Sequence, residues 1–147
     1  MALYAALVFA AIPSTATARD HDAEAATFAV RTVRLLVANR YADAWRSLHP
    51  SHRRAVGSRA RYVQCELSAP FVRRTTTIEA LSVWDETASI AGIGRGPTKA
   101  VTIRIGLTSI GEVETITHTV HVLSVRGTWR WVLPPSRFAS YRRGSCG

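Results

Sequence analysis

At 147 residues, of which 47% are hydrophobic, the chain has the length and apolar content of one domain with one core, which argues against a second domain. Its 19 basic residues outnumber 10 acidic ones, and the net charge of +9 favours anionic neighbours such as lipid headgroups, acidic wall polymers or nucleic acid. The basic residues are scattered, so ordinary solvated surface is the preferred explanation of the charge.

The first eighteen residues differ from the rest of the chain. Residues 2–12 form an uncharged apolar run, and Ala16-Thr17-Ala18 is a small-x-small pattern just before Arg19. This pattern predicts a secretory signal peptide over residues 1–18 with cleavage after Ala18, and hence a secreted or extracytoplasmic location. Retention as an N-terminal anchor is the alternative, because no basic residue precedes the run and Pro13 follows it. No later stretch reaches the roughly 20 apolar residues of a transmembrane span.

The chain has two cysteines, Cys65 and Cys146, which lie far apart in the sequence. In an exported protein such a pair predicts a single disulfide, here between the helical half and the C-terminal tail. A reactive or metal-binding thiol is the alternative.

The first half of the chain has helical patterning. Asp20, Asp22 and Glu24 predict the N-cap and first turn of a helix, because acidic groups suit the free amides at that end. Between Phe28 and Val37 the apolar residues cover a broad arc, so we expect this helix to be mostly buried.

Shorter helical segments follow. Residues 41–48 predict an amphipathic helix that Pro50 ends, and Ser51 begins a turn that stops at Gly57. Ser58 is the predicted cap of a third helix, with Tyr62 and Cys65 on one side.

From Thr75 onward, threonine, valine and isoleucine dominate and the apolar period shortens to two, which predicts sheet. We expect antiparallel strands at 75–84, 87–93, 99–107, 113–125 and 128–133. Turns are expected at Asp85-Glu86, 92–97, 110–111 and 126–127, and the tail from Ser136 to Gly147 looks irregular. The predicted fold class is therefore α+β, with N-terminal helices packed on a strongly curved antiparallel sheet.

Three segments carry a family resemblance: YADAWRSLHP from Tyr41 to Pro50, YVQC from Tyr62 to Cys65, and GTWRWVL in the last strand. With helices first and sheet second, they make residues 22–134 resemble the nuclear transport factor 2-like superfamily. The resemblance implies a cone-shaped, cystatin-like roll over residues 20–134, with 135–147 as a tail tied by Cys146. Its members include isomerases, cyclases and epoxide hydrolases, and the cone mouth can hold an apolar ligand. Membership does not transfer a reaction.

An enzyme of this kind needs a carboxylate inside the cone, and none is expected there. Asp43 lies on the polar side of its helix, and Asp85 and Glu86 fall in a predicted turn, where such residues bond their own backbone. The remaining strand acids are explained by strand ends and exposed faces: Glu79, Glu112 and Glu114.

No metal or cofactor is expected. His118 and His121 lie three apart on a strand, so they point to opposite faces, and at most one lines a cavity. His49 and His52 flank Pro50 at a helix corner, which suggests a cap or a solvated turn. The glycines of residues 92–99 lack the order of a phosphate loop, and no Gly-x-Ser-x-Gly elbow occurs.

The aromatic residues of the helices and the last strand are the most suggestive group, because these elements would line a cone pocket. The predicted ligand-binding residues are Tyr41, Trp45, Tyr62, His118, Trp129 and Trp131. Core packing is the alternative for Trp129 and Trp131, which lie two apart and share a strand face.

These patterns predict a non-enzymatic exported domain that binds a small apolar ligand or an envelope partner. The alternatives are a cone-fold isomerase or hydrolase and an electrostatic binder of anionic surfaces. A homodimer through the sheet fits the fold, and export argues against nucleic acid as the partner.

Overall fold

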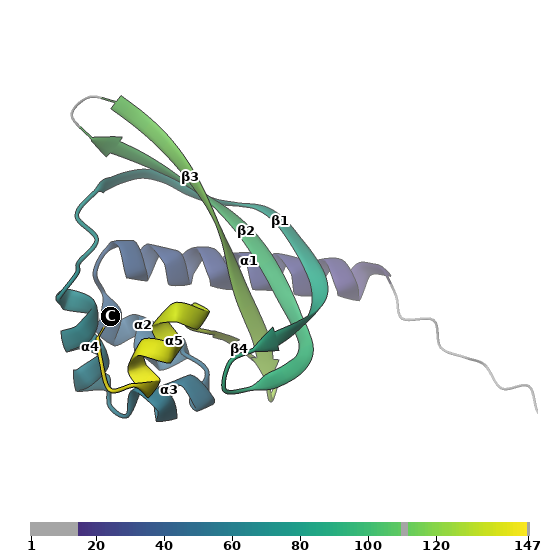
Figure 1. Ribbon diagram of the computed structural model, residues 1–147. Coiled ribbons are helices and arrows are strands. Elements are labelled where there is room, and N and C mark those ends of the chain that lie inside the picture. The colour runs from purple at the N-terminus through teal and green to yellow at the C-terminus, as the bar shows by residue number, and fades with distance from the viewer. Residues whose placement is uncertain (1–14, 110–111, 147) are drawn as a thin grey trace, which may run out of the picture.

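The computed structural model describes residues 15–109 and 112–146 of the chain (Figure 1). The helices and strands in chain order are α1 Thr15–Val37, α2 Tyr41–Ser47, α3 Pro50–Val56, α4 Arg59–Leu67, β1 Arg74–Ile90, β2 Gly94–Ser109, β3 Glu112–Val125, β4 Thr128–Trp131 and α5 Pro135–Arg142. The predicted signal peptide lies outside the described residues up to position 14, and residues 15–18 are the start of α1. None of the described helices is long and apolar enough to cross a membrane.

Helix α1 begins at Thr15, earlier than the sequence predicted, and its first turn holds no acidic residue. The predicted N-cap role of the acids from Asp20 onward is therefore wrong. Asp22 instead accepts a hydrogen bond from the Lys99 amine of β2 at 2.6 Å, which joins α1 to the sheet. Ala25 and Ala29, one helical turn apart, are fully buried, because small side chains let the helix lie close to the strands.

The short helices follow the predicted order. Ser58 caps α4 as expected, because its hydroxyl accepts the Arg61 amide hydrogen bond at 3.1 Å. The predicted turn over residues 51–57 is a complete short helix that starts with Pro50, a residue suited to the first helical position. The disulfide between Cys65 and Cys146 is present, as predicted.

The sheet is open and antiparallel, in the order β1-β2-β3-β4. The turn predicted at Asp85-Glu86 is wrong, because β1 runs through both residues. Their partners come from other elements: Asp85 lies 2.7 Å from the Lys99 amine, and Glu86 lies 2.7 Å from His121. Such cross-strand pairs outweigh a local preference for turns. The hairpin turn occupies residues 91–93 only, so the segment predicted as a loop at 94–97 belongs to β2.

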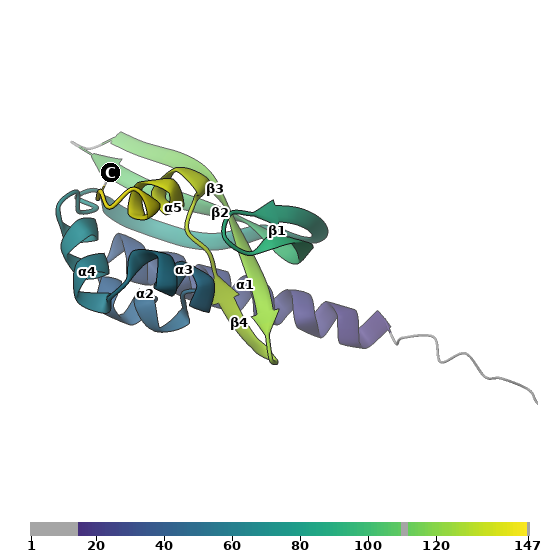
Figure 2. The same cartoon turned by 60° about the horizontal axis from the view of Figure 1, so that its bottom comes forward.

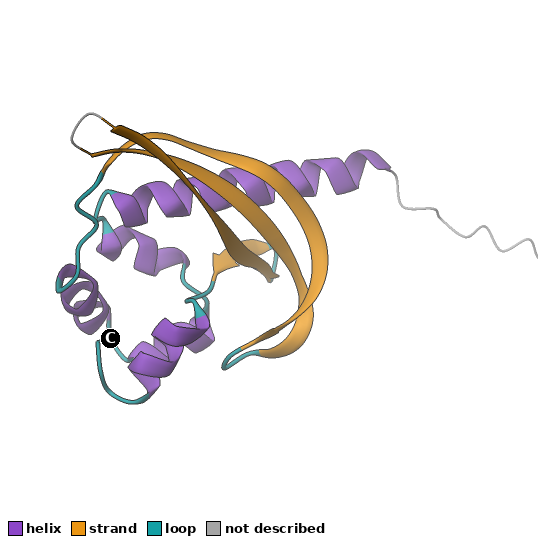
Figure 3. Cartoon of the chain, turned by 45° about the horizontal axis from the view of Figure 1, so that its top comes forward, coloured by secondary structure: helices purple, strands orange, loops and turns teal. Residues whose placement is uncertain are grey.

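Two register shifts bend the long hairpin of β1 and β2. They fall between Thr75 and Thr77 and between Ala80 and Ser82, where β1 holds one extra residue. Gly106 lies opposite Thr77, and a Cβ there would come within 2.6 Å of the Thr77 hydroxyl. Figure 3 shows the strands curving together, with the helices on the side toward which the sheet bends.

One face of β2, on which apolar residues alternate with polar ones on the other face, forms the centre of the core. Val101, Ile103, Ile105 and Leu107 are at most 5% exposed, whereas Arg104 between them is exposed. The buried side chains meet those of α1, β3 and β4 in one apolar cluster.

The C-terminal tail, predicted to be irregular, contains helix α5. Pro135 stands in its first turn, and Tyr141 is 1% exposed, so the segment is part of the core. Phe138 packs on the His52 ring at 4.6 Å between centroids and lies over Gly92 in the β1–β2 turn. A side chain at Gly92 would overlap the Phe138 ring, and its φ of +73° also favours glycine. Figure 2 shows α5 beside α3 and above β4.

His52 is fully buried, so the prediction of a cap or solvated turn is wrong for it. Its Nδ1 accepts the Leu133 amide hydrogen bond at 2.9 Å, which places the ring proton on Nε2, and Nε2 donates to the Ala91 carbonyl at 2.8 Å. Burial lowers the pKa of His52 against the opposing effect of the Ala91 bond. His49 does cap α3, as its Nδ1 accepts the Ser51 amide hydrogen bond at 3.2 Å.

Candidate functional site

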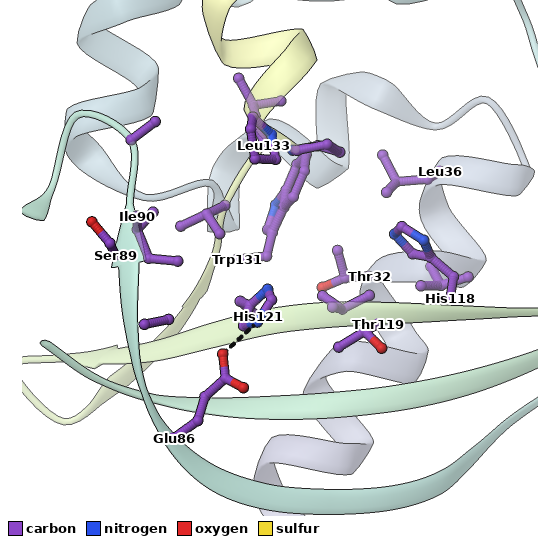
Figure 4. A pocket seen from close by; sticks show the side chains of 17 residues that line it. Thr32, Leu36, Glu86, Ser89, Ile90, His118, Thr119, His121, Trp131 and Leu133 are labelled. Carbon is purple, nitrogen blue, oxygen red and sulfur yellow. Dashed lines mark hydrogen bonds and ion pairs between the residues drawn. The ribbon is translucent and has the colours of Figure 1, made fainter. Parts of the chain in front are cut away.

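A cavity of about 390 Å³ lies between α1, the C-terminal end of β1, the middle of β3 and the segment joining β4 to α5 (Figure 4). Most of its lining residues are apolar, among them Val33, Leu36, Ile90, Val120, Trp131 and Leu133. The volume falls within the range of small-molecule sites, which begins at about 300 Å³. An apolar cavity of this size is suited to a small organic ligand.

The cavity wall formed by Trp131 and Leu133 is fixed by hydrogen bonds behind it. The Trp131 indole N–H donates to the Ala44 carbonyl of α2 at 2.9 Å, and Trp131 is only 3% exposed. The Leu133 amide is held by His52. Since both residues are anchored from outside the cavity, this wall is pre-formed rather than dependent on a ligand.

The cavity borders the edge of β3 beyond the end of β4. Strand β4 pairs only with residues 122–125 of β3, so the preceding residues have no strand on that side within the described ranges. Residues on both faces of β3 therefore reach the cavity. His118 and His121 both line it, and the prediction that at most one does so is wrong. Successive side chains of β3 do alternate between the two faces of the sheet, so His118 and His121 lie on opposite faces. Both reach the cavity because the cavity lies at the edge of the strand.

The main polar feature of the cavity is a pair formed by Glu86 and His121, whose Oε1 and Nε2 lie 2.7 Å apart. Glu86 lies opposite Thr98 and His121 opposite Ala100, two neighbouring same-face positions of β2. Because Thr98 and Ala100 are small, the two longer side chains meet across the intervening strand. Figure 4 shows Glu86 extending toward His121, with Trp131 on the other side of the cavity.

Two further polar side chains bear on the cavity: Trp84, which bonds Glu86, and His118, which is partly desolvated. The other carboxylate oxygen of Glu86 accepts a hydrogen bond from the Trp84 indole at 3.3 Å. His118 is exposed in area, yet the protein atoms around its ring lower its pKa by desolvation, and His121 lowers it further. His118 is therefore held in its neutral form near neutral pH.

A second cavity of about 330 Å³ lies between α4, α5 and the end of β4. Tyr41, Tyr62 and Trp131 line it, with Glu66 and Arg137 at its polar side. Desolvation raises the pKa of Tyr62, and the Glu66 carboxylate adds to the effect. Trp131, Leu133, Leu36 and Pro134 border both cavities, so they form the partition between the two.

The six predicted ligand-binding residues do not gather at one site. His118 and Trp131 line the first cavity, and Tyr41, Tyr62 and Trp131 line the second. Trp129 lines a separate open basin together with Arg31, Arg40, Arg46 and Arg130. Trp45 lines none of these spaces and packs on Tyr62 at 5.5 Å between ring centroids.

Glu86 and His121 are the residues that sequence reasoning missed. The misplaced turn removed Glu86 from the sheet, although residues 87–90 continue the strand without glycine or proline. That continuity is the signal that favours one long strand and a cross-strand role for Glu86.

In the parts of the chain that the structure describes, no three potential metal ligands come together. The chain matches no protein-family model, no curated protein and no solved structure. The functional argument therefore depends on the cavity itself.

Proposed function

We propose that the protein is an exported domain that binds one small, mainly apolar ligand in the cavity between α1 and the curved sheet. The observation that carries the proposal is this space of about 390 Å³ with a pre-formed, largely apolar wall. Pre-formed apolar cavities favour binding because little ordering is required of the protein.

The fold proposal is a cone-shaped roll of the nuclear transport factor 2-like kind. It is supported by the order of the elements, helices before an antiparallel sheet, and by the two register shifts that bend β1 toward the helices. Helix α1 and the segment after β4 both line the cavity, together with residues of β1 and β3.

Export is supported by two features. The disulfide between Cys65 and Cys146 suits an oxidising compartment. The sequence of residues 1–18 has the pattern of a signal peptide. Cleavage after Ala18 would keep Asp22, the partner of Lys99, and Ala25, which is buried against the sheet.

The proposal is tested with N-phenyl-1-naphthylamine, an uncharged apolar fluorophore whose emission rises in apolar surroundings. We expect saturable binding with one site per chain. Its affinity should change little with salt, since the fluorophore is uncharged and the cavity wall is largely apolar. Ala88→Trp should abolish it, because Ala88 lines the cavity and an indole would fill it. Ala60→Trp, on the exposed surface of α4, is the matched control and should bind as the wild type does.

Absence of saturable binding would contradict the proposal. Binding that survives Ala88→Trp and falls steeply with salt would contradict it as well, and would favour the electrostatic alternative.

A catalytic domain is the second candidate, and the position of Glu86 favours it. A carboxylate that orients a histidine beside an apolar cavity is an arrangement that general acid–base catalysis uses. The two candidates differ in the fate of the ligand. A small-molecule extract of the host, incubated with the protein, should keep its mass spectrum if the domain only binds. Changes that His121→Gln abolishes would indicate catalysis.

A further inference from the structure

We infer that the ligand is a neutral alcohol, an apolar molecule whose hydroxyl group binds at the Glu86–His121 end of the cavity. This inference rests on the proposed function and names the chemical class of its ligand.

The charge of the cavity wall favours a neutral ligand. The chain has 19 basic residues, yet the described residues that line this cavity include no lysine and no arginine. Glu86 is their one carboxylate. A carboxylate or phosphate ligand would therefore lose its hydration next to a like charge, without a cationic partner, which is costly in an apolar site.

The hydrogen-bonding capacity left at the Glu86–His121 pair favours a ligand that donates a hydrogen bond. A carboxylate only accepts hydrogen bonds, so in the neutral imidazole Nε2 of His121 donates to Glu86 and Nδ1 carries a lone pair. Within the described ranges, Nδ1 has no hydrogen-bond partner. The ligand group that matches a lone pair of this kind is a donor, and a hydroxyl is a donor without charge.

The rest of the polar lining agrees with a neutral ligand. Thr32 donates its hydroxyl hydrogen to the Phe28 carbonyl at 3.0 Å, which leaves lone pairs on its oxygen. His118 has a lowered pKa, so it adds no positive charge near neutral pH. Neither residue supplies the cation that an acid ligand needs.

Two probes of the same carbon number, decan-1-ol and decanoate, compare a hydroxyl head group with a carboxylate. Each is used to displace bound N-phenyl-1-naphthylamine. The assay is run at pH 8, where decanoate is fully ionised, and at about 150 mM salt to screen the surface charge. We expect decanol to displace the fluorophore at a concentration at least about tenfold lower than decanoate. The net charge of +9 alone would favour decanoate, so it works against the expected result.

The variant that isolates the cause is Glu86→Gln, which keeps the shape of the side chain and removes its charge. It should strengthen decanoate binding and reduce the preference for decanol over decanoate to about threefold or less. Glu114→Gln is the matched control. Glu114 is an exposed strand acid that pairs with Arg73 at 2.7 Å, and it does not line the cavity. It should keep the full preference.

Equal or tighter binding of decanoate to the wild type would overturn the inference and leave the proposed function standing. A preference that Glu86→Gln does not change would overturn it too, provided that circular dichroism shows the variant folded. If the fluorophore itself does not bind, the proposed function fails first, and the inference fails with it.

Discussion

Two of the histidines, His52 and His121, belong to contrasting regions of the molecule. His52 lies at the helical end, where α3, α5 and the β1–β2 turn meet, and both of its ring nitrogens are bonded to backbone groups. His121 lies at the cavity, where Glu86 engages one nitrogen and the described residues supply no partner for the other. The same side chain thus completes a core in one place and retains binding capacity in the other.

This difference shows where stability and function reside in the molecule. At the helical end, polar groups are consumed by internal partners, and the disulfide and α5 close the structure. At the cavity, an apolar wall is left uncovered and one polar pair remains accessible. Substitutions at the helical end should therefore affect folding, and those at the cavity should affect binding.

The largest expected effect comes from breaking the helical end at its disulfide. The double variant Cys65→Ser/Cys146→Ser releases a link across 81 residues, and the chain-entropy model assigns it about 4.5 kcal/mol. Urea denaturation should show this loss in the free energy of unfolding. Neither cysteine lines the first cavity, so fluorophore affinity of the folded variant should stay within about threefold. A loss below about 1 kcal/mol would contradict the assigned role of the disulfide.

The next effect comes from His52→Ala. The substitution leaves the Leu133 amide and the Ala91 carbonyl without their partner and opens a space beside Phe138. Unsatisfied buried groups and a cavity together should cost about 3 kcal/mol in urea denaturation. The matched control is His21→Ala, whose side chain is 63% exposed, and it should change stability by less than about 0.5 kcal/mol. Similar losses for the two variants would remove the contrast.

The pH dependence of stability should follow His52. Its pKa in the folded state is lowered from 6.5, so below that pH the unfolded chain binds a proton that the folded chain does not. The free energy of unfolding should therefore fall as the pH drops from 6.5 toward the folded pKa. His52→Gln cannot titrate and should show a weaker fall, with a remainder from His49 and His118, whose pKa values are also lowered by desolvation. An unchanged pH profile would show that His52 is not responsible.

The smallest effect on stability is expected at the cavity. His121 and Glu86 are each 32% exposed, and a hydrogen bond between partly exposed side chains contributes about 1 kcal/mol. His121→Gln should therefore unfold at nearly the urea concentration of the wild type while binding decanol less tightly. Loss of stability on the scale of His52→Ala would mean that the pair is structural.

Local patterns in the sequence predicted what local forces decide. The alternation of Val101, Ile103 and Ile105 fixed one face of the sheet, and Ser58 marked the start of α4. The single pair of cysteines predicted the disulfide. In each case the relevant physical preference belongs to neighbouring residues or to one unambiguous chemical pair.

Features that depend on distant partners were not predicted. Asp85 and Glu86 have turn-forming side chains, but Lys99 and His121 hold them in a strand. Helix α5 lacks a clear apolar period, and it is positioned by Phe138 on His52 and by Tyr141, whose hydroxyl donates to Glu66 at 2.7 Å. The cavity joins α1, three strands and the link to α5, and no short segment contains that information.

The central claim is that ligands occupy the space between α1 and the curved sheet, and methyl NMR spectra recorded during a decanol titration test it most directly. We predict chemical-shift changes at Val33, Leu36, Ile90, Val120 and Leu133, which line that cavity. The methyl groups of Leu67, Val72 and Val113, exposed elsewhere on the molecule, should stay unchanged. Changes confined to the exposed methyl groups, with the cavity methyl groups unaffected, would contradict the account.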